Sequence, residues 1–169
     1  MIRARGFTLI ELVIVVCVVA LLFGVALDRL VRYQELGERA ALQQNVAAMN
    51  SALALRFAGY VVMGTPQRIA EEVGRNPVHL LARAPEAYVG ELPAADPNSL
   101  SRPAWYFDSA SGELVYLPTR RRYWGSSSAA PDSIRFRVAV TGGEAMPGEP
   151  RVLPQPFVAA NPPFRWEID

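Results

Sequence analysis

Residues 7–27 read FTLIELVIVVCVVALLFGVAL, a continuous run of mostly apolar residues. Fifteen of its 21 residues are Val, Ile, Leu or Phe, and its only ionisable side chains are Glu11 and Cys17. As an α-helix it would be about 31 Å long, which matches the hydrocarbon core of a bilayer. Each apolar residue favours insertion by about 0.3–0.6 kcal/mol, against about 2.5–3.5 kcal/mol for one carboxylate. The stretch therefore predicts a membrane-spanning helix, because a lipid-exposed backbone must form its hydrogen bonds internally.

The helix is expected to continue as an amphipathic segment over residues 28–60. No proline precedes Pro66, and apolar side chains recur three or four residues apart, at Leu42, Val46, Met49, Leu53, Phe57 and Tyr60. This spacing puts them on one helical face. We therefore expect one helix from Phe7 to near Tyr60, ended by Gly64 and Pro66.

Residues 61–169 are punctuated by Gly, Pro, Ser and Asn and predict a β-rich head. Candidate strands, rich in aromatic or β-branched residues, are 105–108, 113–117, 134–140 and 164–168. Ser109 to Gly112 look like a hairpin connection. Residues 142–163 contain six prolines and predict an irregular surface segment. The predicted fold class is α+β, with the second half of the long helix packed on a small antiparallel sheet.

The composition excludes several classes of protein. All 17 basic residues are arginines, so there is no lysine for a P-loop or a Schiff base. One histidine and one cysteine are too few for a His/Cys zinc site or an intrachain disulfide. A net charge of +1 gives no global field that attracts nucleic acid. We expect no enzymatic activity, no cofactor, no metal and no nucleic-acid partner.

A motif opens the apolar run. Residues 6–12 read GFTLIEL and follow a short basic stretch, residues 1–6. Here the chain resembles the bacterial type IV pilin-like family, which includes pilins, minor pilins and the pseudopilins of type II secretion. The resemblance implies that residues 1–6 are a leader, that a prepilin peptidase cuts between Gly6 and Phe7, and that Phe7 becomes N-methylated. It also implies that Glu11, the fifth mature residue, sets the register between assembled subunits.

The resemblance implies a location and partners as well. The protein would cross the bacterial inner membrane once, with a cytoplasmic N-terminus and a periplasmic head, and then join a pilus or pseudopilus. Its partners would be the prepilin peptidase, other pilin or pseudopilin subunits, the inner-membrane assembly platform and the lipid bilayer. Arg3 and Arg5 agree with this orientation, but Arg29, Arg32 and Arg39 flank the other end of the span. The orientation therefore rests on the motif.

A second, looser resemblance concerns the head. Short segments look like the head of minor pilins in mannose-sensitive haemagglutinin-type systems; they are Asn76-Pro77, Leu80-Leu81, Tyr88 to Glu91, Trp105 to Asp108 and Leu114 to Tyr116. Abundant pilins often close their C-terminal region with a disulfide, which a single cysteine does not allow. The sequence thus favours a minor pilin, with a type II secretion pseudopilin as the alternative.

Two further clusters leave other functions open. Arg120, Arg121, Arg122, Tyr123 and Trp124 have a composition suited to phosphate contact and base stacking, as in a membrane-anchored module that binds DNA or a surface ligand. Loss of the leader would lower the net charge from +1 to −1, which favours a solvated loop or a subunit contact there. Three aspartates, Asp96, Asp108 and Asp132, are candidates for a calcium site, but they form no clustered loop, and turn or strand-end roles are favoured.

Overall fold

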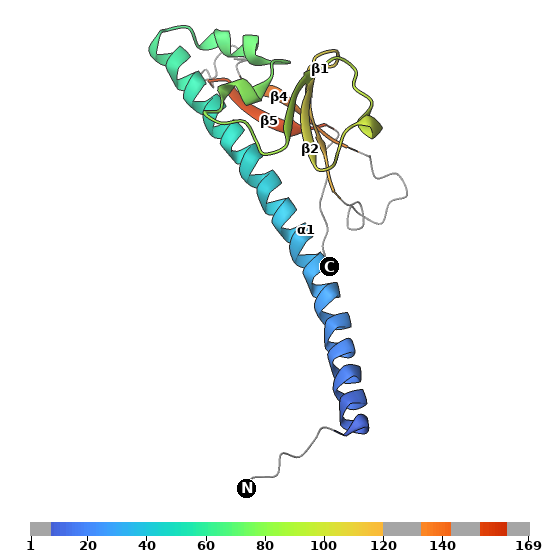
Figure 1. Cartoon of the computed structure of the whole chain (residues 1–169). Helices are drawn as coiled ribbons and strands as arrows, with labels where there is room; N and C mark the ends of the chain where they lie inside the picture. The colour runs from blue at the N-terminus through green and yellow to red at the C-terminus, as the bar shows by residue number, and fades with distance from the viewer. Residues whose placement is uncertain (1–7, 120–132, 143–152, 162–169) are drawn as a thin grey trace. The chain divides into compact units, whose positions relative to one another are not determined.

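The computed structural model describes residues 8–119, 133–142 and 153–161 of the 169-residue chain (Figure 1). The chain divides into two compact units, residues 1–40 and 41–169. Helix α1 (Leu9–Val62) runs through the described part of the first unit and provides the first element of the second. A small five-stranded sheet follows it, so the predicted α+β class is confirmed.

Helix α1 begins and ends close to the predicted residues. It starts at Leu9, whereas Phe7, the predicted start, lies outside the described residues. At its end, Gly64 takes a φ of 71°, a backbone conformation that glycine adopts at little cost. The Gly64 N–H donates to the Val61 carbonyl at 3.0 Å, and the Thr65 N–H donates to the Tyr60 carbonyl at 2.8 Å. These two bonds form a Schellman motif, which satisfies the last carbonyls of the helix.

The amphipathic stripe on the second part of α1 is also confirmed. Leu42, Met49, Leu53 and Tyr60 are buried, and Val46 packs against the same cluster. Neighbouring residues such as Leu55, which is 76% exposed, lie on the other face. The spacing of three and four residues therefore marks the face of the helix that enters the core of the second unit.

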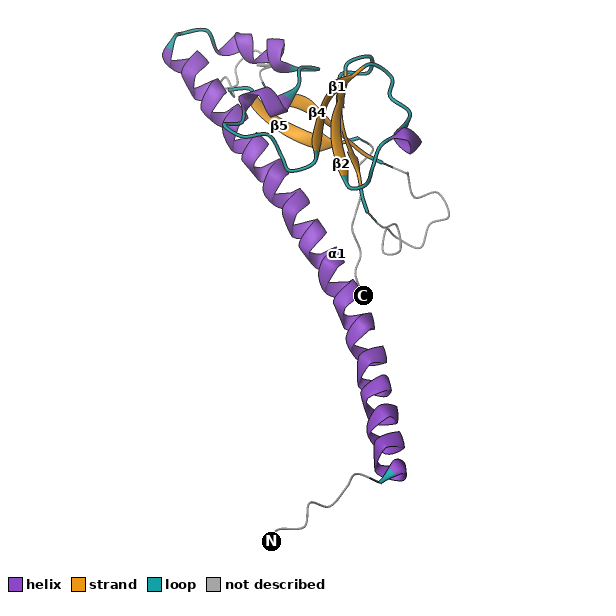
Figure 2. Cartoon of the chain, viewed as in Figure 1, coloured by secondary structure: helices purple, strands orange, loops and turns teal. Residues whose placement is uncertain are grey.

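The sheet has five strands in chain order. Figure 2 draws the strands in orange. They are β1 (Tyr88–Leu92), β2 (Ala104–Asp108), β3 (Glu113–Leu117), β4 (Ile134–Thr141) and β5 (Gln155–Ala160). Strands β2, β3 and β4 coincide with three predicted strands, and β2 and β3 form the predicted hairpin around residues 109–112. The fourth predicted strand, residues 164–168, lies outside the described residues.

The prediction of a purely antiparallel sheet is wrong. Strand β1 pairs with β2 in parallel, with Tyr88 beside Trp105, so the sheet is mixed. Residues 93–103, which include the short helix η3 (Pro97–Ser99), carry the chain back to the start of β1 before β2 begins. The sequence signal for β1 is weak, because the strand is only half-buried and is interrupted at Gly90, where φ is 122° and the pairing shifts.

The prediction that residues 142–163 are irregular is wrong at its C-terminal end. Strand β5 pairs antiparallel with β4 and contains Pro156, opposite Val140. The Val158 N–H points away from β4 and donates to the Asn50 Oδ1 atom of α1 at 2.8 Å. Residues two apart in a strand direct their N–H groups to the same side. Pro156 therefore lacks only an outward N–H, and the edge strand loses no bond to β4.

The strands β2 and β3 are buried on both faces of the sheet. On the face toward α1, Trp105, Phe107, Leu114, Tyr116, Ile134, Phe136, Val138 and Val158 join the helix stripe in one cluster. The rings of Trp105 and Tyr116 have centroids 4.6 Å apart, and those of Trp105 and Phe136 are 5.7 Å apart. On the other face, Ala104, Tyr106, Val115 and Leu117 pack under residues of the β1–β2 connection. This layering gives the small unit a well-filled core.

A buried carboxylate organises the β2–β3 turn. Asp108 accepts hydrogen bonds from the Ala94 and Ala110 N–H groups, both at 3.1 Å, and from the Ser111 hydroxyl at 2.9 Å. Arg135 lies 3.6 Å from it. Burial by itself would raise the pKa of Asp108, but the hydrogen bonds from Ala94, Ser111 and Ala110 outweigh it and hold the pKa below its ordinary value. The charged form of Asp108 therefore stabilises the fold.

We predict that Leu53→Ala destabilises the second unit by about 2–5 kcal/mol, because it leaves a cavity between the helix and the sheet. The matched control is Leu55→Ala on the exposed face of the same helix, which should change stability by less than about 0.5 kcal/mol. Thermal unfolding of the full chain in mild detergent, followed by the near-ultraviolet circular dichroism of the buried aromatic residues, measures both. Equal effects of the two substitutions would contradict the burial of Leu53.

We predict that Asp108→Asn lowers stability at pH 7 by about 1.5–3 kcal/mol, the range for hydrogen bonds to a charged group. Because the folded-state pKa is depressed, the stabilisation is present above the unfolded-state pKa and is lost as pH falls through the folded one. Urea unfolding in mild detergent between pH 7 and pH 3 should show a shallower acid loss of stability in the variant. Asp96→Asn, at the exposed cap of η3, is the control that should keep the wild-type pH profile.

Candidate functional site

The first part of α1 exposes an apolar surface along its whole length. Large hydrophobic side chains that are between 45% and 81% exposed are Leu9, Ile10, Leu12, Val13, Ile14, Val15, Val16, Val18, Val19, Leu21, Leu22, Phe23, Val25 and Leu27. The most apolar 18-residue window of α1 has a mean hydropathy of 3.0, and none of it is buried. Among the described residues, α1 is the one helix that is long and apolar enough to cross a membrane.

This surface requires cover. Soluble monomers rarely expose contiguous apolar patches larger than a few hundred Å², and transfer of one such side chain out of water is worth about 1.5–3 kcal/mol. A helix that is hydrophobic on all sides is typical of a membrane span or of a core formed with other helices. Lipid or the apolar helices of other molecules would satisfy it.

The N-terminal end of α1 is capped by Thr8. The Leu12 N–H donates to the Thr8 carbonyl at 3.1 Å, and the Glu11 N–H donates to the Thr8 Oγ1 atom at 3.4 Å. Thr8 is therefore the N-cap, and Glu11 occupies the third helical position. The sequence motif thus has a local structural meaning, because its threonine starts the helix that its glutamate joins.

Glu11 is the one carboxylate in the exposed apolar window. Its side chain is exposed, and no described residue forms an ion pair with it. A negative charge in the first turn is favoured by the positive end of the helix dipole. In a membrane or between apolar helices, a carboxylate is costly unless a group of opposite charge faces it. In such an environment Glu11 would need a cationic group beside it.

The other predicted site residues divide into two groups. Gly6 and Phe7 lie outside the described residues, as do Arg120, Arg121, Arg122, Tyr123, Trp124 and Asp132. Asp96 and Asp108 are described and take turn roles: Asp96 accepts the Asn98 N–H at 2.9 Å at the start of η3, and Asp108 holds the β2–β3 turn. In the described part of the chain, no three His, Cys, Asp or Glu side chains gather as a metal site would require.

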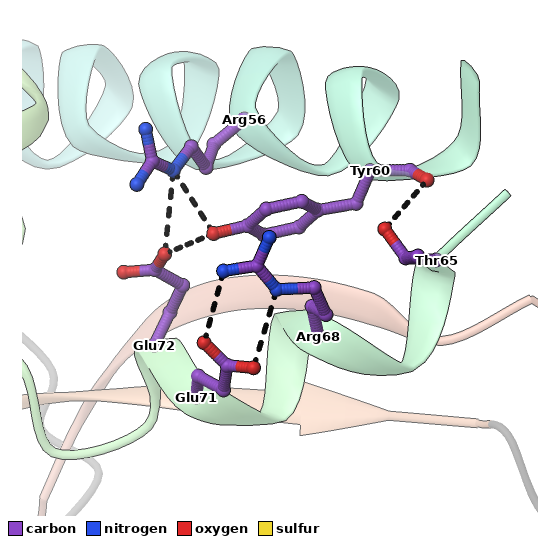
Figure 3. Close-up of polar contacts among 6 residues, drawn as sticks. All are labelled: Arg56, Tyr60, Thr65, Arg68, Glu71 and Glu72. Atoms are coloured by element: carbon purple, nitrogen blue, oxygen red, sulfur yellow. Dashed lines mark hydrogen bonds and ion pairs between the residues drawn. The ribbon is translucent and has the colours of Figure 1, made fainter. Parts of the chain in front are cut away.

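Sequence reasoning missed a polar cluster at the end of α1, shown in Figure 3. The Tyr60 hydroxyl donates to the Glu72 Oε1 atom at 2.7 Å, and the Arg56 Nε atom donates to both of these groups. Glu72 belongs to the short helix η1 (Pro66–Glu72) and is buried. The guanidinium of Arg68 lies 5.1 Å from the centre of the Tyr60 ring and pairs with Glu71. The cluster ties η1 to α1 with opposite charges paired, so its role is structural.

A second polar cluster joins the short helix η2 (Pro77–Leu80) to β1. The Asn76 Oδ1 atom accepts the Val78 N–H at 3.1 Å, while its amide donates to the Tyr88 hydroxyl and to the Glu91 Oε1 atom, both at 2.8 Å. His79 lies 3.3 Å from Glu91. Asn76, Tyr88 and Glu91 belong to the segments that resemble the head of minor pilins. In the structure, Asn76 caps η2 and also links it to Tyr88 and Glu91 of β1.

Comparison of the chain with protein-family models, curated proteins and solved structures finds no match.

Proposed function

We propose that this protein is a structural, minor pilin-like subunit that is processed by a prepilin peptidase and assembles through α1 into a type IV pilus. The observation that carries the proposal is the exposed apolar part of α1 with one carboxylate, Glu11, in its first turn. The GFTLIEL motif thus opens a helix whose apolar surface is unfavourable in water. The proposal assigns the chain no catalytic activity and no cofactor.

The chemistry of the motif supports processing at Gly6. Glycine before the scissile bond leaves the backbone unhindered, and Arg3 and Arg5 hold the leader at the cytoplasmic face. Cleavage would expose the α-amino group of Phe7, which keeps a positive charge after methylation. Phe7 then stands one residue before the N-cap Thr8, so the new charge lies next to the start of α1.

Glu11 then acts as a register device. Its carboxylate would face the Phe7 amino group of a neighbouring subunit within an apolar environment, where an unpaired charge is expensive. Sliding of one helix along the other would separate the two charges. The apolar side chains supply the contact area, and the charge pair selects one axial position, which is the best attested role of buried charges.

The choice between a pilus and a secretion pseudopilus depends on the head and on the cysteine content. The looser resemblance of the head and the single cysteine favour a minor pilin of a mannose-sensitive haemagglutinin-type system. A type II secretion pseudopilin is the alternative. In both cases the head would be periplasmic while the protein crosses the inner membrane. The length and apolar composition of α1 are compatible with such a single span.

A binding module, the alternative function, would depend on different residues of the chain. A membrane-anchored module that binds DNA or a surface ligand would use α1 only as an anchor and would bind through Arg120 to Trp124. The basic and aromatic composition of that segment is the observation in its favour. Such a module would not need Glu11, and this difference makes the two functions separable.

We predict that Glu11→Ala and Glu11→Gln reduce incorporation into filaments by at least about tenfold while membrane insertion and the yield of folded head remain unchanged. The physical reason is loss of the charge that sets the register, since one charge pair lost in an apolar environment is worth more than 1.4 kcal/mol. Sheared filaments probed by immunoblot measure the effect. Arg121→Ala is the matched control; normal assembly of both Glu11 variants, with loss of function in Arg121→Ala, would favour the binding module.

We predict that the mature chain begins at Phe7 and carries one added methyl group in a host with a prepilin peptidase, and that it retains Met1 in a host without one. Intact-mass and N-terminal peptide mass spectrometry measure both states. The control is Gly6→Ala, which should slow processing because a side chain then stands at the scissile bond. An unprocessed chain in the host that has the peptidase would reject the assembly proposal and leave a membrane anchor.

A further inference from the structure

Two arginines and a tyrosine follow the apolar part of α1 directly. Arg29 and Arg32 are exposed, and Tyr33 is 65% exposed. Residues three and four apart in a helix are neighbours on its surface, so Arg29 lies beside both Arg32 and Tyr33. Val25, four residues before Arg29 and 58% exposed, belongs to the same face. This arginine face, made of Val25, Arg29, Arg32 and Tyr33, changes from apolar to cationic within about one turn.

The arginine face keeps a positive charge. None of the described residues forms an ion pair with Arg29 or Arg32. Glu35, which follows Arg32 by three residues, is buried, whereas both arginines are exposed. By sequence, residues 28–33 contain the two arginines and one acidic residue, Asp28, and so carry a net charge of +1. An anionic partner would therefore meet a cationic surface here.

The position of this face along α1 matches the headgroup layer of a bilayer. From Leu9 to Leu27 the helix is about 27 Å long, close to the roughly 30 Å of a hydrocarbon core. The headgroup region adds about 5–8 Å on each side. Arg29 lies about 3 Å beyond Leu27 along the helix, and Arg32 lies about 7.5 Å beyond it. Arg39, about 18 Å beyond Leu27, is outside this layer.

The side chains of the arginine face suit a phospholipid. Helical side chains lean toward the N-terminus of their helix, so those of Arg32 and Tyr33 lean toward the apolar run. A guanidinium group binds phosphate through two parallel hydrogen bonds, and tyrosine is enriched at membrane surfaces because its ring is apolar and its hydroxyl is polar. A phosphate joined to an acyl chain would contact both the arginines and Val25. A soluble anion would contact only the arginines, so the face favours a lipid.

We propose that Arg29, Arg32 and Tyr33 bind the headgroup of an anionic phospholipid and thereby fix the depth of α1 in the bilayer. A shift of the helix toward the hydrocarbon would bury two guanidinium groups, which is costly. A shift in the opposite direction would move Val25 into water, which is also unfavourable. The inference rests on the membrane-spanning part of the proposed function, but not on processing or assembly.

Native mass spectrometry of the full chain tests the lipid contact. The chain is reconstituted in vesicles with equal amounts of phosphatidylglycerol and phosphatidylcholine, and the lipids that stay bound are counted. Arg29→Gln combined with Arg32→Gln should lower the ratio of bound phosphatidylglycerol to phosphatidylcholine by at least about fivefold, the effect of one arginine near an anionic surface. Arg39→Gln is the matched control and should leave the ratio within about twofold, because its charge is screened at that distance. Equal ratios in these variants would overturn the proposal.

Inorganic phosphate distinguishes a lipid from a free anion as the ligand. It is added to the vesicles at the same ionic strength as a sodium chloride control. Both salts should lower the ratio equally, because both act by screening. A larger decrease with phosphate would indicate a site for free phosphate and would overturn the assignment to a lipid.

Cys17 separates failure of this inference from failure of the proposed function. It is exposed within the apolar run and is the only cysteine of the chain, so a nitroxide label attaches there alone. In a spanning helix the label should be reached by oxygen, which dissolves in hydrocarbon, and not by a water-soluble nickel chelate. A label that the chelate reaches would overturn the membrane span and this inference together. A protected label, with a lipid ratio that the double variant leaves unchanged, would overturn this inference alone.

Discussion

The fold depends on one helix, α1, that carries two different surfaces. Apart from Glu11, the residues of α1 from Leu9 to Leu27 are apolar on every side of the helix. Such a surface is typical of a membrane span or of a core formed with other helices. From Leu42 onward the same helix has one apolar face, and that face forms a wall of the core of the second unit. Because a single element carries both surfaces, the sheet can be small: five strands and one helical face complete the core.

Several polar side chains around this core form hydrogen bonds or ion pairs with other parts of the second unit. Asp108 holds the β2–β3 turn, Arg135 bridges the carboxylates of Asp108 and Glu113, and Asn161 bonds Glu113 from the end of β5. Asn50 reaches from α1 to the outer edge of β5. The contacts of Arg135 with Glu113, of Asn161 with Glu113 and of Asn50 with Val158 join segments that are far apart in the chain. Such contacts set the register of strands whose apolar pattern alone would tolerate a shift.

The sequence predicted the parts of the fold that carry a local pattern. The helix, its apolar stripe, strands β2 to β4 and the hairpin follow from periodicity and from Gly64 and Gly112 near the turns. Strand β1 was missed because Gly90 interrupts a half-buried segment, and its parallel pairing depends on a long connection that has no short-range signal. Strand β5 was missed because Pro156 argues against a strand until its missing N–H is known to face outward. At the candidate site, the motif indicated Glu11 and the structure added the cap by Thr8, whereas the Tyr60 cluster required tertiary contacts that no local pattern encodes.

The hydrogen bonds from α1 to other parts of the second unit have a mechanical consequence. The Asn50 bond to Val158 lies within the stretch of α1 that packs on the sheet, and the Tyr60 bond to Glu72 lies in its last turn. A tensile load along the axis of α1 would reach the head through these bonds and through the interlocked side chains between them. Such a load would act in shear on the hydrogen bonds and on the side-chain packing between α1 and the sheet. These contacts would therefore share the load instead of breaking one after another. A helix anchored in this way is suited to transmit force into the head without first unwinding from its end.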